Sequence, residues 1–160
     1  MDTRDLRNCF GHFATGVTIV TYHDDEGNKK GLTINSFTSV SLDPPLVLIS
    51  IDKNTNAYQD LQDRPFVINI LSSEQRPHAL QFAGRQQEGL DIKWKEDSDV
   101  GPSLQDTVGT IECTPWAQYD GGDHVLFIGK VEDYAYTNNE SLLFHKAQFL
   151  QTTNNSVESL

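Results

Sequence analysis

Apolar and polar positions alternate along most of this chain with the period of two that is typical of a strand with one buried face. The strands that this alternation predicts are 17–23, 31–42, 46–51, 65–71, 106–119 and 123–136. Asp120-Gly121-Gly122 separates the last two runs, and paired glycines between alternating runs predict a hairpin. The pattern therefore predicts a mainly β domain.

Three segments show the spacing of an amphipathic helix, namely 3–14, 54–63 and 72–83. The first has an apolar face made of Leu6, Cys9, Phe10 and Phe13. In the third, Ser72 and Gln75 have the spacing of a capping box, and Pro77 must lie in the first turns of that helix. We expect these helices to cover a small β-barrel.

The segment 31–45, GLTINSFTSVSLDPP, departs from the alternation in its middle. Leu32, Ile34 and Val40 keep the even positions, but Phe37 falls on the other face. Such a break marks a bulge or bend, and bulges gather beside active sites. The many hydroxyl and amide side chains of this segment suit a planar ligand rich in heteroatoms. The alternative is an edge strand with a wet face rich in Thr and Ser.

Composition and charge narrow the class of protein. The 160 residues suffice for one domain, which we expect over 1–150, followed by a flexible tail over 151–160. Twelve basic against 23 acidic residues leave no basic stripe for a nucleic acid. No apolar run approaches a membrane span, and the charged N-terminal segment does not resemble a secretion signal. A cytoplasmic protein that binds neither nucleic acid nor membrane is the expectation.

The common catalytic signatures are absent. Cys9 and Cys113 stand alone, without a CxxC pair or a histidine at metal-ligand spacing. The sequence has no P-loop, no GxGxxG and no HExxH, so neither a nucleophile nor a metal is expected. For an anionic ligand, Lys53 and Arg85 are the candidate local cations.

Separated motifs, taken in order, point to one family. FATGVTIVT at 13–21 precedes the segment 31–45, and Phe82-Ala83-Gly84 and Gly122-Asp123-His124 follow it. From about Leu6 to Phe149 the chain resembles the short-chain flavin reductase family. The resemblance implies an FMN-binding split β-barrel and a homodimer with FMN or FAD at the subunit interface. It also implies reduction of that flavin by NADH or NADPH, in many relatives for a partner flavin-dependent monooxygenase.

The resemblance also assigns roles by position. The strand that faces the isoalloxazine ring corresponds to Thr33, Ile34, Asn35 and Ser36. The segment at the ring edge and phosphate corresponds to Ser50, Ile51, Lys53, Thr55 and Asn56. The segment that closes over the ribityl-phosphate tail corresponds to Phe82, Ala83, Gly84 and Arg85. His124 corresponds to a histidine on the nicotinamide side. One departure is Ala57, which stands where many relatives carry a threonine.

This chemistry explains why no nucleophile is found, because hydride passes from the nicotinamide to flavin N5 and the protein supplies binding and orientation. The absence of a basic residue suited to a 2′-phosphate favours NADH over NADPH, while FMN and FAD stay equal alternatives. His124 either positions the nicotinamide or supplies a proton, or it is a surface residue beside a turn. A flavin carrier without turnover is the alternative function.

Overall fold

The computed structural model describes residues 1–96, 98–153 and 156–158. Its helices are α1 (Thr3–Phe10), α2 (Asn56–Asp60) and α3 (Arg76–Gln81). The first strands are β1 (Thr15–Gly16), β2 (Thr18–His23), β3 (Lys29–Ile34), β4 (Thr38–Leu42) and β5 (Pro45–Asp52). They are followed by β6 (Phe66–Ile70), β7 (Gly109–Gly121), β8 (His124–Tyr136), β9 (Leu142–His145) and β10 (Gln148–Gln151). Within these ranges, no helix has the length and apolar character needed to cross a membrane.

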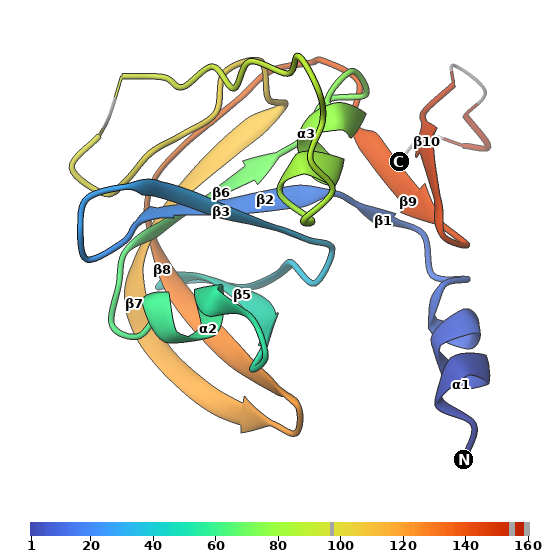
Figure 1. Cartoon of the computed structure of the whole chain (residues 1–160), viewed down its shortest axis with the longest axis horizontal. Helices are drawn as coiled ribbons and strands as arrows, with labels where there is room; N and C mark the ends of the chain where they lie inside the picture. Colours follow the sequence, from blue (N-terminus) through green and yellow to red (C-terminus); the bar gives the residue numbers. More distant parts are fainter. Residues whose placement is uncertain (97, 154–155, 159–160) are drawn as a thin grey trace.

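One large antiparallel sheet forms the body of the molecule, in the order β3-β2-β6-β7-β8-β5-β4. Its two edges, β3 and β4, are consecutive in the sequence and are joined by residues 35–37. The sheet therefore curls so that its edges approach each other without pairing (Figure 1). This mainly β, split-barrel architecture is the fold that the sequence predicts.

Strand β2 shows why the core has two parts. All of Thr18 to Tyr22 is buried, because both faces of the strand are covered. Val20 and Tyr22 point into the barrel with Ile49 and Phe127, whereas Ile19 packs outside it in a second cluster. The other members of the second cluster are Val17, Leu71, Ala79, Leu104 and Leu142. In Figure 1, α3 and the segment that follows it cover this outer face.

A smaller sheet, β1-β9-β10, lies beside the barrel next to α1 (Figure 1). Asp2 begins α1 by accepting from the amides of Arg4 (2.8 Å) and Asp5 (3.2 Å). The helix ends at Phe10, and the predicted end at residue 14 is wrong, because the chain must extend there to pair Thr15 with Phe144. None of the α1 side chains is buried.

The broken alternation in 31–45 has a clear structural meaning. The predicted single strand 31–42 is two strands, β3 and β4, at opposite edges of the sheet. The double proline lies in the turn of the β4–β5 hairpin, and β5 begins at Pro45. The hairpin predicted at Asp120-Gly121-Gly122 is confirmed between β7 and β8. Residues 154–155 and 159–160 of the predicted tail lie outside the described residues.

Candidate functional site

The link between β3 and β4 is fastened to β5 by a pair of serines. The Ser36 hydroxyl donates to the Ser50 carbonyl oxygen (2.8 Å) and accepts from the Ser50 amide (3.1 Å). Asn35, the preceding residue, has no strand partner and an exposed side chain. Ile51 follows Ser50 and is fully buried in the barrel core, so only its backbone can reach a ligand.

The end of β5 meets the tip of the β7–β8 hairpin, which comprises 120–124. Asp52 is the register partner of His124. Beyond this pair, the Lys53 amide donates to the carbonyl oxygen of Asp123 (3.0 Å), and the Lys53 ammonium forms an ion pair with the Asp120 carboxylate. This hydrogen-bonded pairing raises the pKa of Lys53 and lowers the pKa of Asp120. The positive charge of Lys53 is therefore directed at the hairpin tip.

His124 is half-buried and is oriented by its neighbour in the sequence. Its Nδ1 lies 2.7 Å from Asp123 Oδ1, and this hydrogen bond lowers the pKa of the Asp123 carboxyl. Because a carboxylate only accepts, Nδ1 carries the proton and Nε2 is left for another partner. The carboxylate thus sets the tautomer and the ring orientation of His124 in the neutral form.

A cavity of about 720 Å³, here the Asn35–His124 cavity, brings together residues that are far apart in the sequence. Besides these two, α1 and the β9–β10 turn line it, through Arg7, Asn8, Phe10, Gly11, His12, Phe13, Phe144, Lys146 and Ala147. Arg7 and Lys146 bring two cations to its wall, which would favour an anionic ligand. Neither cation belongs to a motif that the sequence pattern indicates.

A neighbouring cavity of about 600 Å³, the Thr15 cavity, shares Asn35, Phe10 and Phe13 with the first. Ser36 and Thr15 also line it. The Thr15 hydroxyl is buried and has no hydrogen-bond partner among the described residues. A buried hydroxyl without a partner is costly, so a polar group of a ligand in this cavity would satisfy it.

Thr33 and Ile34 face away from these two cavities. The Thr33 hydroxyl donates to the Ala79 carbonyl oxygen (2.7 Å), and its amide donates to the Phe82 carbonyl oxygen (3.2 Å). Ile34 packs against the barrel core. The contribution of Thr33 and Ile34 to a ligand is therefore limited to their backbone, and Thr33 joins β3 to the end of α3.

The segment from Phe82 to Arg85 closes α3. Arg85 N donates to Leu80 O (2.9 Å) and Gly84 N donates to Gln81 O (3.2 Å), with Gly84 at φ +84°. These two bonds make a Schellman motif, which requires the left-handed conformation that glycine adopts without strain. Ala83, Gly84 and Arg85 are exposed.

The Phe82 ring packs on the bare backbone of Gly31, where an added Cβ would lie 2.7 Å from it. Trp94 also contacts the Phe82 ring, and the two rings meet edge-on with their centroids 6.2 Å apart. Phe82 therefore serves the outer core, and the exposed residues after it are the ones that can reach a ligand.

Thr55 and Asn56 lie at the start of α2 and do not line the cavity that His124 lines. They line a hollow of about 450 Å³ between α2 and β3, with Gly31 and Leu32 on its other side. The Thr55 hydroxyl donates to the Asp52 carbonyl oxygen (2.7 Å), so it shapes the turn before the helix. Asp24, Asp60 and Lys30 also line this hollow, and Lys30 lies 4.0 Å from the Asp24 carboxylate, so the charges that face it are mixed.

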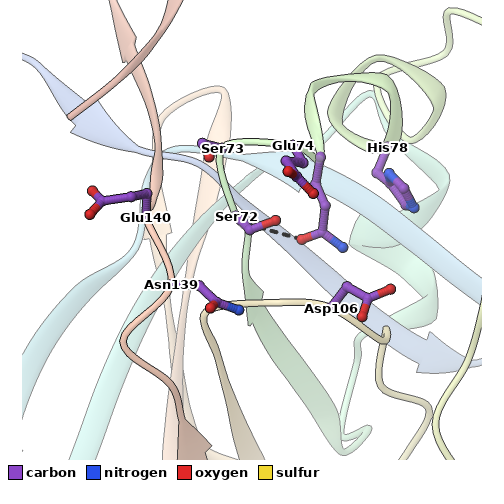
Figure 2. Close-up of a pocket in the computed structure, with 8 residues that line it drawn as sticks. Ser72, Ser73, Glu74, His78, Asp106, Asn139 and Glu140 are labelled. Atoms are coloured by element: carbon purple, nitrogen blue, oxygen red, sulfur yellow. Dashed lines mark hydrogen bonds between the residues drawn. The ribbon is translucent and has the colours of Figure 1, made fainter. Parts of the chain in front are cut away.

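A further cavity, of about 440 Å³, lies where β6, α3 and the segment before β9 meet (Figure 2). The Gln75 side-chain oxygen accepts from the Ser72 amide at 3.0 Å, but α3 begins at Arg76 with Gln75 as its N-cap, so the predicted capping box with Ser72 at the N-cap is wrong. Carboxylates of Glu74, Asp106 and Glu140 line the cavity. None of the predicted site residues does, and its acidity disfavours an anionic flavin or dinucleotide.

Part of the site is therefore predictable from the sequence. The structure brings together Asn35, Ser36, Ser50 and His124, whereas Thr55 and Asn56 line a separate hollow and Phe82 packs in the outer core. Sequence reasoning missed the walls formed by α1, Thr15 and the β9–β10 turn. One signal was present, since the apolar face of 3–14 includes Phe10 and Phe13, which remain 67% and 79% exposed.

Comparisons with known proteins identify the family and the fold. A family model described as flavin reductase like domain matches residues 10–153. An NADH-dependent flavin reductase of a Rhodococcus species is 41% identical over 149 residues, which is 90% of this chain and 83% of that protein. The solved Streptomyces globisporus NADH:FAD oxidoreductase SgcE6, in complex with NAD and FAD fragments, is 35% identical with a TM-score of 0.89. This match covers 97% of this chain and 95% of that one.

One relative is much longer than this chain. The reductase component of the flavin-dependent trigonelline monooxygenase of Acinetobacter baylyi is 36% identical over 157 residues. The match covers 97% of this chain but 51% of that protein, so the chain spans about half of its length.

Proposed function

This chain belongs to the flavin reductase like family, and from that membership we propose that it is an NADH:flavin oxidoreductase. It transfers a hydride from NADH to FMN or FAD and supplies the reduced flavin to a partner monooxygenase. The observation that carries the proposal is the Asn35–His124 cavity, because it joins the broken strand to the hairpin histidine. Cavities of this size are typical of cofactor sites.

The two adjoining cavities fit a flavin beside a nicotinamide. The Thr15 cavity offers an unpartnered buried hydroxyl and the exposed Asn35 amide, which suit the heteroatoms of an isoalloxazine edge. The Asn35–His124 cavity offers the cations Arg7 and Lys146 for the pyrophosphate of a dinucleotide. Phe10 and Phe13 lie between the two and would exclude water from them.

Bound flavin supplies the hydride acceptor, and the residues of the chain orient it. The Asn35 amide can donate to and accept from the flavin edge, while Ser36 holds the backbone of 35–37 in place through Ser50. On the other wall, His124 presents Nε2 to the nicotinamide amide or holds a proton there. We assign the remaining flavin contacts to Thr55, Asn56 and the segment 82–85 by family position.

We further propose a homodimer with the flavin between subunits. An eight-residue helix is marginal by itself in water, and α1 has no buried side chain. A partner subunit that covers Phe10 and Phe13 would bury this face and close both cavities. The expected mass in light scattering is twice the 18.0 kDa of one chain. We also infer a cytoplasmic location, where NADH is abundant, and a single catalytic domain over 1–150.

The decisive experiment measures NADH and NADPH oxidation by the purified protein with added FMN or FAD. NADH consumption well above the background rate is the expected result, with NADPH slower. If the protein binds flavin but consumes neither nucleotide, it is a flavin carrier and the proposed activity is wrong.

Two variants test whether Asn35 serves flavin binding and His124 serves the nicotinamide. Asn35→Ala should weaken flavin binding about ten- to hundredfold, because it leaves desolvated groups unpaired. His124→Ala should leave flavin binding intact and change the KM for NADH or kcat. Asn139→Ala, in the acidic cavity of Figure 2, is the matched amide control and should change neither. Equal loss of flavin affinity in both site variants would contradict this division.

A further inference from the structure

The tip of the β7–β8 hairpin carries His124 at the point where the ladders of β8 with both neighbouring strands end. The last ladder pair between β5 and β8 is Asp52 with His124. At the turn itself, Gly121 and Gly122 have no side chains with which to pack. His124 is itself a ladder residue, but Asp123, whose carboxylate orients its ring, lies beyond the ladder, so the placement of Asp123 depends on contacts made there.

Lys53 makes two contacts with the hairpin tip beyond the end of the ladder. The Lys53 amide donates to Asp123 O at 3.0 Å, and the Lys53 ammonium forms an ion pair with Asp120. Asp120 and Asp123 flank the two glycines, so Lys53 is connected to both arms of the turn. Asp123 in turn holds His124 through Nδ1 at 2.7 Å.

We propose that Lys53 and Asp120 are positioning residues, which orient His124 toward the nicotinamide by anchoring the hairpin tip to the end of β5. This inference rests on the proposed function of His124. It gives Lys53 a different role from the flavin contact that its family position implies. The family position implies no role for Asp120.

The electrostatics of the tip support this role. The hydrogen bond with Asp120 is the main cause of the raised pKa of Lys53, and Asp123 adds a smaller attraction. The same pairing lowers the pKa of Asp120. Two carboxylates, those of Asp120 and Asp123, lie at the tip, and Lys53 is the cation beside them. The charge of Lys53 is therefore paired within the hairpin tip and is less available for a flavin phosphate.

The solvent exposure of the Lys53–Asp120 ion pair determines which measured property its removal should change. The Lys53 side chain is 34% exposed and that of Asp120 is 77% exposed. Exposed ion pairs contribute little to the free energy of unfolding. Small displacements of a positioned group, by contrast, strongly affect a reaction that depends on geometry. We therefore expect the loss to appear in nicotinamide kinetics and in the signals of the His124 ring.

The test uses Lys53→Met, Asp120→Asn and the reversed pair Lys53→Asp with Asp120→Lys. Each single variant should raise the KM for NADH, or lower kcat, about three- to tenfold, and flavin Kd should change less than about twofold. The reversed pair should recover most of the loss. Lys130→Met is the matched control, because Lys130 pairs with Glu132 at 3.9 Å on the same strand, away from the tip.

A second readout needs neither flavin nor turnover. In ¹⁵N-labelled, flavin-free protein, the imidazole resonances of His124 report its tautomer and its bond to Asp123. Both single variants should shift these resonances, and Lys130→Met should not. If the resonances and the KM for NADH stay as in the wild type, the inference is wrong even if the variants lower Tm.

The outcomes also distinguish this inference from the function on which it rests. If Lys53→Met weakens flavin about tenfold or more while Asp120→Asn does not, Lys53 is a flavin ligand and the positioning role is overturned. A wild type that oxidises no NADH overturns the proposed function. In that case the imidazole resonances still decide whether Lys53 and Asp120 orient His124.

Discussion

The Ser36 hydroxyl makes two hydrogen bonds to the backbone of Ser50, donating to its carbonyl oxygen at 2.8 Å and accepting from its amide at 3.1 Å. It thereby supplies the donor and the acceptor that a neighbouring strand would supply. This contact holds residues 35–37, the link between β3 and β4, against β5. The position of Asn35 in both cavities depends on it.

Ser36→Ala should therefore weaken both the fold and the site. We expect a loss of about 1–3 kcal/mol in the free energy of unfolding, because the Ser50 groups lose their partner. Flavin affinity should fall with it, since Asn35 loses its support. Urea unfolding and flavin titration measure the two effects. Ser39→Ala, at an exposed position of β4, is the control, and an equal effect of both variants would contradict the prediction.

Asn69 is the centre of a buried polar network that fastens the loop before β7 to the sheet. Its Nδ2 donates to Ile19 O (2.8 Å) and Thr21 Oγ1 (2.9 Å), and its Oδ1 accepts from Leu104 N (2.8 Å). Asn69→Leu keeps the volume but leaves these groups unpaired. The expected cost is about 2–4 kcal/mol, measured by urea unfolding. The exposed Asn54→Leu should cost less than about 0.5 kcal/mol. A near-neutral Asn69→Leu would show that the loop is held by apolar contacts alone.

The two cysteines should differ sharply in reactivity. Cys9 is exposed, whereas Cys113 is buried, and burial raises the pKa of the Cys113 thiol to about 12. Since the thiolate is the reactive form, Cys113 should react with a thiol reagent only after unfolding. In the native protein only Cys9 should therefore be labelled, more slowly where the proposed dimer covers α1, and native Cys9→Ser should show no labelling. Rapid labelling of native Cys9→Ser would contradict the burial of Cys113.

His78 should make the protein less stable in mild acid. Burial is the main cause that lowers the pKa of His78 below its ordinary value of 6.5, and the nearby Asp106 opposes this shift. As pH falls through 6.5, the unfolded chain takes up the proton first, so the folded state loses relative stability. The contribution is fully present above the unfolded pKa and is lost toward the folded pKa.

The measurement compares His78→Gln with the wild type by urea unfolding at about pH 7.5 and about pH 5.5. The wild type should lose more free energy of unfolding than the variant over this interval. An NMR titration of His78 in the folded protein checks the direction of its pKa shift. A wild type and variant that lose the same free energy would contradict the prediction.

The part of the fold that could be predicted is the part that depends on residues close together in the sequence. The alternation of period two and the glycine pair specify strands and a hairpin from neighbouring residues alone, and β7 and β8 form as expected. The predicted ends of helices are less accurate. The helix α1 ends at Phe10 because the chain must reach the extended position in which Thr15 pairs with Phe144. That pairing joins segments far apart in the sequence, and no pattern of neighbouring residues predicts it.

The sequence by itself therefore determined the mainly β architecture, the break in 31–45 and the family. Only the tertiary structure decided which side chains meet. It turned Thr33 toward Ala79, paired Lys53 with Asp120, and placed Asn35 across a cavity from His124. The physical reason is the curl of the sheet, which brings its two edges and the hairpin tip together through contacts between residues far apart in the chain.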